Sequence, residues 1–238
     1  LVLGSKPYVK NISKKPIVPL GQPGTFNEDG TSYPCVFNDQ LYFTGWKKTI
    51  NVPFENNLGL AIKKGNKFRL YSRAPIFELS HSEPFGVGSV DIMKDTLYHC
   101  WYTAFTSWGT SKKLKHKYKI KYAYSIDGRK WRRRTGDCID FKEGEYAICR
   151  PSVIYFNKMY HMIFCVRGKR YKLGYAYSYD KRNWERNDSL LQITNTPNSF
   201  DSKEMCYPHW FLHKNFLYLI YCGNDYGNEG IGIARLKL

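Results

Sequence analysis

Three ionisable side chains stand a few residues ahead of a proline in widely separated parts of the chain: Asp29, Arg150 and Glu204. A pair of carboxyl groups can transfer protons as general acid and general base. A guanidinium can bind a carboxylate or a phosphate with two parallel hydrogen bonds. These residue types would suit a site for a polar or acidic ligand, provided that the fold brings them together.

A repeated pattern shows how residues so far apart in the sequence could meet. Tyr42, Tyr98, Tyr160 and Tyr218 follow one another at intervals of 56, 62 and 58 residues. Each lies in an aromatic segment that follows a short apolar one, next to a proline in three of the four copies. A third segment and, in three copies, a fourth complete the unit. Short strands joined by turns, without a long helical period, are typical of propeller blades. The first segments are 33–37, 89–93, 150–154 and 207–211.

We therefore predict an all-β fold, a β-propeller of four-stranded antiparallel blades in a single domain, 1–238. The repeats run roughly over 30–75, 85–135, 146–190 and 204–238. A β-sandwich is the main alternative, but it would not repeat in this way. Because the fourth repeat stops after its third strand, either a strand from 7–11 closes four blades, or four repeats of a five-bladed ring are visible and its first blade is missing. We favour the five-bladed ring.

Composition sets further limits. A chain of 238 residues, 42% of them hydrophobic, can bury a sizeable core. No apolar run approaches the ~20 residues of a membrane helix, so we expect no membrane span. The seven cysteines include no C-x-x-C pair, which argues against a zinc site and a disulfide framework and favours a reducing cytoplasm. The histidines show no metal-ligand spacing and no nucleotide or hydrolase motif occurs, so we expect neither metal nor cofactor.

The net charge of +17 indicates a negatively charged partner. Part of the excess is concentrated in two segments, Lys112–Lys121 and Arg129–Arg134. An acidic glycan, a nucleotide-sugar or a nucleic acid would each fit this charge. The alternative is a solvated strand edge, on which lysines discourage pairing with other chains.

Four segments of the chain stand out, 42–46, 150–153, 174–178 and 204–208. They resemble the five-bladed β-propeller glycosidases, which include glycoside hydrolase families 32, 43 and 130. The resemblance extends from about Lys15 to Leu238. Within this group the chain is most similar to uncharacterised propeller proteins often encoded with bacterial surface-polysaccharide genes. The resemblance implies a carbohydrate-active propeller with a central funnel. It also implies a general base, usually an Asp, on a first blade that is missing from the pattern here.

In a propeller the innermost strands start around the central funnel, and this is where we look for a site. Cleavage of a glycoside needs two carboxyl groups, one to protonate the leaving oxygen and one to activate water or attack carbon. We select Glu204 as the acid and Asp29 as the base or an orienting carboxylate. The resemblance implies a further carboxylate where Arg150 stands, so Arg150 is a candidate for binding an acidic sugar. The expected substrate-binding residues are Trp46, Glu145, Tyr146, Arg167, Tyr207, Asn224, Asp225 and Tyr226.

Three functions remain open on these grounds. The first is a glycoside hydrolase-like enzyme that acts on an acidic glycan or a sugar precursor through carboxylate acid–base chemistry. The second is a propeller that binds a glycan without catalysis, having kept the funnel and lost the base. The third, which we favour least, is nucleic-acid binding through the basic run and its interleaved aromatic residues. The expected ligand is thus a carbohydrate or nucleotide-sugar; the oligomeric state does not follow from the sequence.

Overall fold

The computed structural model describes residue 3 and residues 8–77 and 79–238. It confirms the all-β prediction, since its helices are two single turns, η1 (Asp188–Leu190) and η2 (Asp225–Gly227). In the described part of the chain no helix is long and apolar enough to span a membrane. Pro7, at the start of the segment 7–11, lies outside the described residues, and from that segment Tyr8 forms a single β-bridge.

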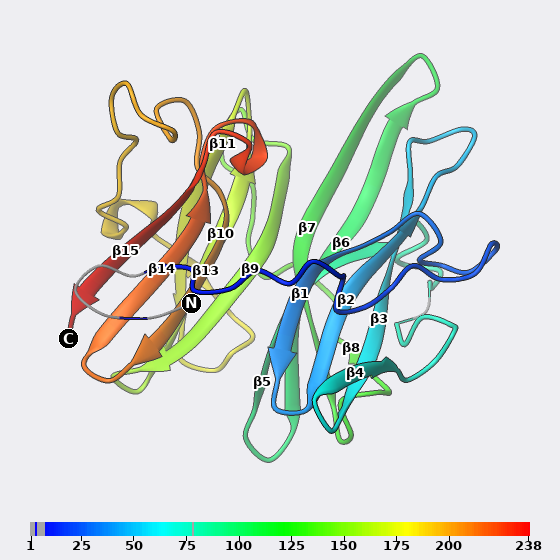
Figure 1. Ribbon diagram of the computed structural model, residues 1–238. Coiled ribbons are helices and arrows are strands. Elements are labelled where there is room, and N and C mark those ends of the chain that lie inside the picture. The colour runs from blue at the N-terminus through cyan, green and yellow to red at the C-terminus, as the bar shows by residue number, and fades with distance from the viewer. Residues whose placement is uncertain (1–2, 4–7, 78) are drawn as a thin grey trace.

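The strands fall into four sets that follow the repeat (Figure 1). Within each set neighbouring strands are antiparallel and follow chain order, and a single parallel pairing between Tyr118 and Ala147 joins the second set to the third. The sets are β1 (Gly30–Phe37), β2 (Gln40–Lys47), β3 (Glu55–Lys64), β4 (Lys67–Leu70); β5 (Val87–Lys94), β6 (Tyr98–Thr110), β7 (Lys113–Ser125), β8 (Arg132–Arg133); β9 (Ala147–Phe156), β10 (Met159–Arg167), β11 (Tyr171–Ser178), β12 (Glu185–Arg186); and β13 (Cys206–His213), β14 (Phe216–Cys222), β15 (Ile231–Lys237).

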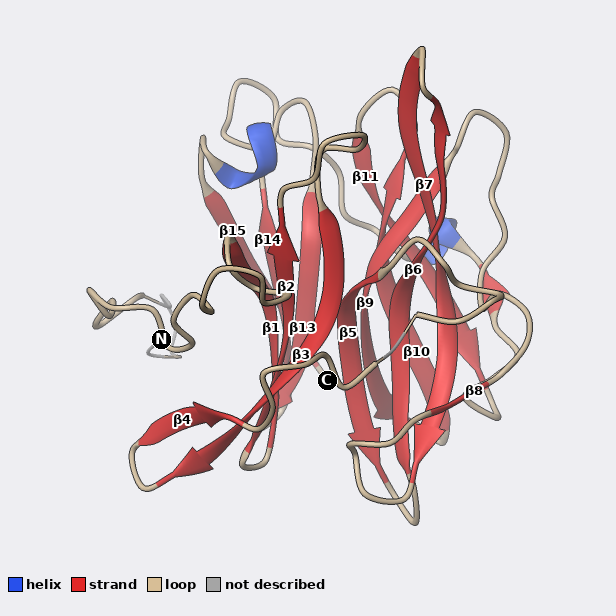
Figure 2. Cartoon of the chain, turned by 90° about the vertical axis from the view of Figure 1, so that its right-hand side faces the viewer, coloured by secondary structure: helices blue, strands red, loops and turns tan. Residues whose placement is uncertain are grey.

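The first strands of the four sets pack in series, β1 against β5, β5 against β9 and β9 against β13. Figure 2 shows that most strands of the different sets are aligned along one common axis, in alternating directions, with loops at the two ends of this axis. The starts of these first strands therefore lie close together, although they are separated by more than fifty residues in the sequence. This arrangement places the four leading segments where a shared site can form.

Aromatic side chains at the end of one set of strands pack against the set before it. Trp184 packs edge-on against Trp101, whose indole N–H donates to the carbonyl of Lys181 at 2.9 Å. In the same way Trp131 packs edge-on against Tyr42. Buried aromatic pairs of this geometry contribute about 0.5–1.5 kcal/mol beyond their area burial. The repeated aromatic residues thus fix how adjoining sets are oriented.

Two repeat-equivalent histidines serve this packing. His99 on β6 bonds the Tyr122 hydroxyl at 2.6 Å, and His161 on β10 bonds the Tyr175 hydroxyl at 2.7 Å. In both cases burial lowers the pKa of the imidazole, so the ring is neutral at pH 7. Their equivalent positions and partners identify them as structural links between neighbouring strands.

The first strands are bulged near their starts. Tyr33, Arg150 and Tyr207 occupy equivalent positions, immediately before a proline, and have φ angles of 49°, 55° and 53°. A non-glycine residue in this left-handed region costs on the order of 1–3 kcal/mol, and a following proline disfavours the region further. Bulges of this kind re-aim side chains and are common beside functional sites. All three side chains line the same cavity.

Candidate functional site

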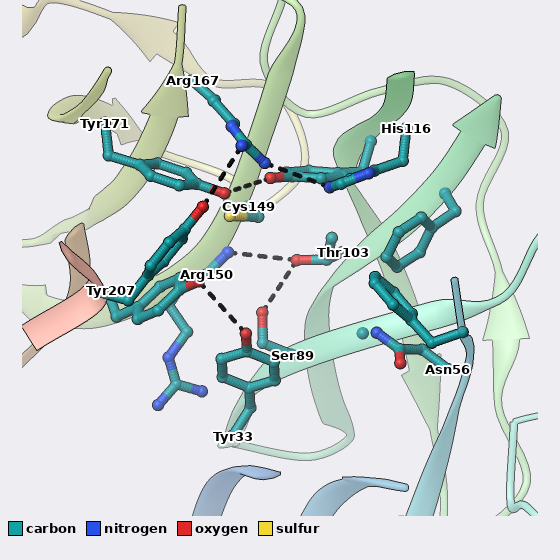
Figure 3. Close-up of a pocket in the computed structure, with 15 residues that line it drawn as sticks. Tyr33, Asn56, Ser89, Thr103, His116, Cys149, Arg150, Arg167, Tyr171 and Tyr207 are labelled. Atoms are coloured by element: carbon teal, nitrogen blue, oxygen red, sulfur yellow. Dashed lines mark hydrogen bonds between the residues drawn. The ribbon is translucent and has the colours of Figure 1, made fainter. Parts of the chain in front are cut away.

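A cavity of about 270 Å³ lies at the bulged starts of the first strands (Figure 3). The four repeat-equivalent residues Tyr33, Ser89, Arg150 and Tyr207 all line it, one from each set of strands. We call this cavity the axial pocket. Its other lining residues are Phe54, Asn56, Gly88, Thr103, Phe105, His116, Tyr118, Cys149, Arg167, Tyr171 and Tyr226.

Repeat-equivalent side chains hold two of the bulged residues in place. The backbone N–H of Arg150 donates to Thr103 Oγ1 at 3.2 Å, and that of Tyr207 donates to Cys165 Sγ at 2.8 Å. Thr103 and Cys165 each stand five residues after the repeated tyrosine of the preceding set. The left-handed backbone is therefore fixed by a contact between adjoining sets.

Arg167 supplies positive charge to the axial pocket, whereas Figure 3 shows the guanidinium of Arg150, the second lining arginine, pointing away from Arg167 and Thr103. The Arg167 guanidinium lies 5.1 Å from the Tyr171 ring centre and contacts His116 Nε2 at 3.3 Å and the Tyr226 hydroxyl at 3.4 Å. The Arg150 guanidinium lies 5.3 Å from the Tyr33 ring centre. Among the described residues neither arginine forms an ion pair with a carboxylate, and none of the 15 lining residues drawn in Figure 3 is acidic. A site with positively charged and without negatively charged side chains favours binding of an anion.

The remaining polar groups are neutral hydrogen-bonding groups. The hydroxyls of Tyr118 and Tyr171 are 2.5 Å apart, and those of Tyr33 and Tyr207 are 3.4 Å apart. Burial raises the pKa of all four tyrosines, so they keep their protons at pH 7 and can donate as well as accept. Burial, followed by the nearby Arg167 charge, lowers the pKa of His116. Its neutral ring can therefore accept from the Arg167 guanidinium.

The two predicted carboxylates occupy different places. Glu204 lies behind the wall of the axial pocket, where Oε2 accepts the N–H of Tyr171 at 3.2 Å and Oε1 accepts the N–H of Asp225 at 3.1 Å. Asp29 lies at the turn before β1, where Oδ2 accepts the N–H of Lys48 at 2.7 Å. Neither residue lines the axial pocket. The structure thus places Glu204 next to pocket-lining residues and does not bring Asp29 into that cavity.

Some of the predicted binding residues line the axial pocket and others do not. Arg167, Tyr207 and Tyr226 join Arg150 in the axial pocket. Tyr146 lies just outside, between the Lys115 ammonium at 3.8 Å and the Arg167 guanidinium at 5.8 Å from its ring centre.

The other four predicted binding residues make structural contacts. Glu145 forms ion pairs with Arg186 at 2.7 Å and with Lys172. The buried Asn224 side chain accepts the backbone N–H of Glu204 at 3.1 Å, and Asp225 supplies the N–H that Glu204 itself accepts. Trp46 packs against Gly30, where its ring fills the space that a side chain would need.

Several lining residues were not among the sequence-based candidates. Tyr33 and Ser89 could have been found by extending the repeat from Arg150 and Tyr207, since all four occupy the same position in their copies. His116 and Tyr118 lie on β7, where strand alternation directs both to one face. No group of three or more metal-ligating side chains occurs among the described residues. The arrangement can bind an anion and present aromatic faces and hydroxyls to a polar ring.

Comparisons with known proteins agree with the fold. A thermostable family-43 glycoside hydrolase superimposes with a TM-score of 0.65 at 15% identity, over 88% of this chain and 70% of that one. The protein in a BT0996 complex with RGII gives a TM-score of 0.70 at 16% identity, over 93% and 73%. A member of the GH130 family of mannoside phosphorylases gives 0.59 at 15% identity, over 90% and 66%. The chain therefore has the fold of the β-propeller glycosidase superfamily.

Sequence similarity identifies its family. The chain is 32% identical over 245 residues to the uncharacterized protein Rv1502 of Mycobacterium tuberculosis strain H37Rv, and equally to protein MT1551 of strain CDC 1551. The alignment covers 100% of this chain and 81% of each relative. The protein belongs to the family of these two relatives. No protein-family model matches it.

Proposed function

We propose that the protein binds an acidic carbohydrate in the axial pocket, as a carbohydrate-active member of the propeller glycosidase superfamily. The observation that supports this most directly is Arg167, a cation without a carboxylate partner among the described residues, in a cavity lined by tyrosines; Arg150 is a second cation at the wall of this cavity. Arginine can bind a carboxylate or phosphate with two hydrogen bonds. The tyrosine faces and hydroxyls would contact the sugar ring and its hydroxyl groups.

The size of the axial pocket limits the ligand. At about 270 Å³ it lies at the lower end for ligand sites. This favours one terminal sugar residue, or the sugar or phosphate portion of a nucleotide-sugar, over a whole oligosaccharide. A carboxylate on the sugar and a phosphate attached to it present the same anionic chemistry to the arginines, and the experiment below separates the two.

Glycoside cleavage is a second candidate because a carboxylate, Glu204, lies next to the axial pocket. It accepts the backbone N–H of pocket-lining Tyr171 and that of Asp225, the neighbour of Tyr226. A glycosidase needs a second carboxylate, and the described lining residues contain none. Binding is therefore the function that the geometry supports better. If Glu204 is the acid, Glu204→Gln should abolish cleavage of an alkyl glycoside, whose poor leaving group needs protonation, and leave sugar affinity within a few fold. Equal turnover in both proteins would exclude this role.

Binding is tested by calorimetry with four probes: glucuronate, glucose 1-phosphate, UDP-glucose and neutral glucose. We expect an anionic probe to bind at least tenfold more tightly than glucose. Arg167→Gln should weaken that binding about 10- to 100-fold, because a hydrogen bond to a charged group contributes about 1.5–3 kcal/mol. Arg170→Gln removes the same charge from an exposed side chain outside the axial pocket and serves as the matched control. Equal affinity for glucose and the anions, or equal loss in both variants, would refute the proposal.

We also propose a number of blades and a cellular location. We propose a five-bladed ring, supported by the fold likeness to family-43 and GH130 proteins. A crystal structure would count the blades. We propose a cytoplasmic location, supported by seven free thiols in the described structure. Labelling of Cys35 and Cys222, the two partly exposed thiols, in intact and in lysed cells would test this, since only lysis should give an impermeant reagent access to them.

A further inference from the structure

The long hairpin of β6 and β7 carries a row of lysines that the axial pocket does not use. This hairpin projects beyond the neighbouring strands (Figure 1). Lys113, Lys115 and Lys117 are exposed and stand at every second position of β7, whose pairing with β6 is irregular between Leu114 and Lys117. Their spacing is about 6.6–6.8 Å per pair of residues. His116 and Tyr118, also on β7, line the axial pocket.

These three lysines differ from the next two lysines along β7. Lys119 is paired with Asp137 at 2.6 Å, and Lys121 with buried Glu83 at 3.4 Å. Lys113, Lys115 and Lys117 form no ion pair with any carboxylate of the described residues. We call these three side chains the lysine row.

A shared aromatic residue connects the lysine row to the axial pocket. The Lys115 ammonium lies 3.8 Å from the Tyr146 ring centre, and the Arg167 guanidinium lies 5.8 Å from the same ring. Arg167 in turn lines the axial pocket. The Tyr146 ring thus links one cation of the axial pocket, Arg167, to one lysine of the row, Lys115.

Protection of a strand edge explains part of this pattern. In the segment 113–117, β7 pairs only with β6, and lysines on such an edge discourage pairing with other chains. Edge protection does not require that one lysine stack on an aromatic ring shared with a pocket arginine. Nor does it explain why the row leads to a cavity without acidic groups.

We propose that the ligand is a linear acidic polysaccharide, whose terminal residue occupies the axial pocket and whose following residues lie along the lysine row. This inference rests on the proposed function. It specifies the substrate class as a polymer with a repeated negative charge. A polysaccharide is favoured over a nucleic acid because the row is linked through Tyr146 to a pocket that is small and lined with tyrosine hydroxyls.

The test compares uronate oligomers of one to eight residues by calorimetry at low salt. We expect affinity to rise at least tenfold from the monomer to the octamer. The triple variant Lys113→Gln, Lys115→Gln and Lys117→Gln should lose about tenfold in octamer affinity, in line with three exposed ion pairs, and keep its monomer affinity. The matched control is Lys64→Gln, Lys67→Gln and Lys130→Gln, which removes the same charge from exposed lysines elsewhere and should bind the octamer normally.

The outcomes separate this inference from the proposed function. Tight monomer binding that does not increase with chain length would overturn the polymer inference and leave the pocket proposal standing. Failure of every uronate and sugar phosphate to bind would overturn both. Oligo-dT binding that equals or exceeds octamer binding, and that survives Arg167→Gln, would identify the lysine row as a nucleic-acid surface and also overturn the inference.

Discussion

Asp91 is a buried carboxyl where the second and third sets of strands meet, and its titration should be measurable in the stability of the protein. Only 9% of the residue is exposed, Oδ2 accepts the N–H of Val153 at 2.5 Å, and Oδ1 accepts the N–H of Ile92 at 3.1 Å. Burial raises the pKa of this group from 3.8 to about 6, against the opposing effect of these hydrogen bonds. The folded protein therefore binds this proton more tightly than the unfolded chain does.

The sign and size of the effect follow from linkage. A carboxyl whose folded pKa is raised stabilises the fold as pH falls, since the folded state takes up the proton first. The gain starts near pH 6 and is complete below the unfolded pKa of 3.8. Between pH 7.5 and 4.5 it amounts to about 2 kcal/mol, out of about 3 kcal/mol for the full shift.

The perturbation is Asp91→Asn, which removes the titration and keeps the shape. We measure the free energy of unfolding in urea for wild type and variant at pH 7.5 and 4.5. The difference, variant minus wild type, should be about 2 kcal/mol more favourable to the variant at pH 7.5 than at pH 4.5. Other groups, including the buried histidines, titrate in both proteins and cancel. Asp39→Asn, at an exposed carboxyl, is the control and should show no such change.

A result within about 0.5 kcal/mol of zero for this change would refute the reasoning, because one pKa difference of this size cannot leave the linkage unchanged. The absolute stability of the variant is a separate matter. If the amide nitrogen of the new asparagine faces the Val153 N–H, that buried donor has no acceptor, at a cost of about 1–3 kcal/mol. The prediction therefore concerns the pH dependence and not the stability at one pH.

Two further predictions concern the axial pocket. Because burial and the Arg167 charge lower the pKa of His116, its ring should stay neutral as the pH falls from 7.5 to 6.5, and calorimetry should find the same change in glucuronate affinity over this range in wild type and in His116→Gln; a rise confined to wild type would contradict this. Arg150→Asn should unfold at the same or a higher temperature than wild type, since asparagine tolerates a φ of 55° better, while losing at least tenfold in anion affinity. A clear loss of thermal stability would mean that the left-handed backbone is not strained at Arg150.

The repeat made much of the fold predictable. The similar spacing of Tyr42, Tyr98, Tyr160 and Tyr218 predicted the four strand sets, and the proline segments identified Arg150 and Tyr207, which do line the axial pocket. The direction of a side chain in a loop was not predictable. Glu204 and Asp29 both stand ahead of first strands, as expected, but their orientation depends on backbone N–H groups of distant residues, which no local pattern reveals.

The bulged residues give a reason to regard the axial pocket as a built site and not a packing gap. A left-handed residue before a proline is unfavourable for the isolated strand, yet it recurs at Tyr33, Arg150 and Tyr207. For Arg150 and Tyr207 a side chain of the preceding set, Thr103 or Cys165, holds the N–H in place, so docking of the sets enforces the unfavourable conformation. Because contacts between the strand sets hold this conformation, the fold itself orders the pocket backbone, and little ordering cost should oppose binding.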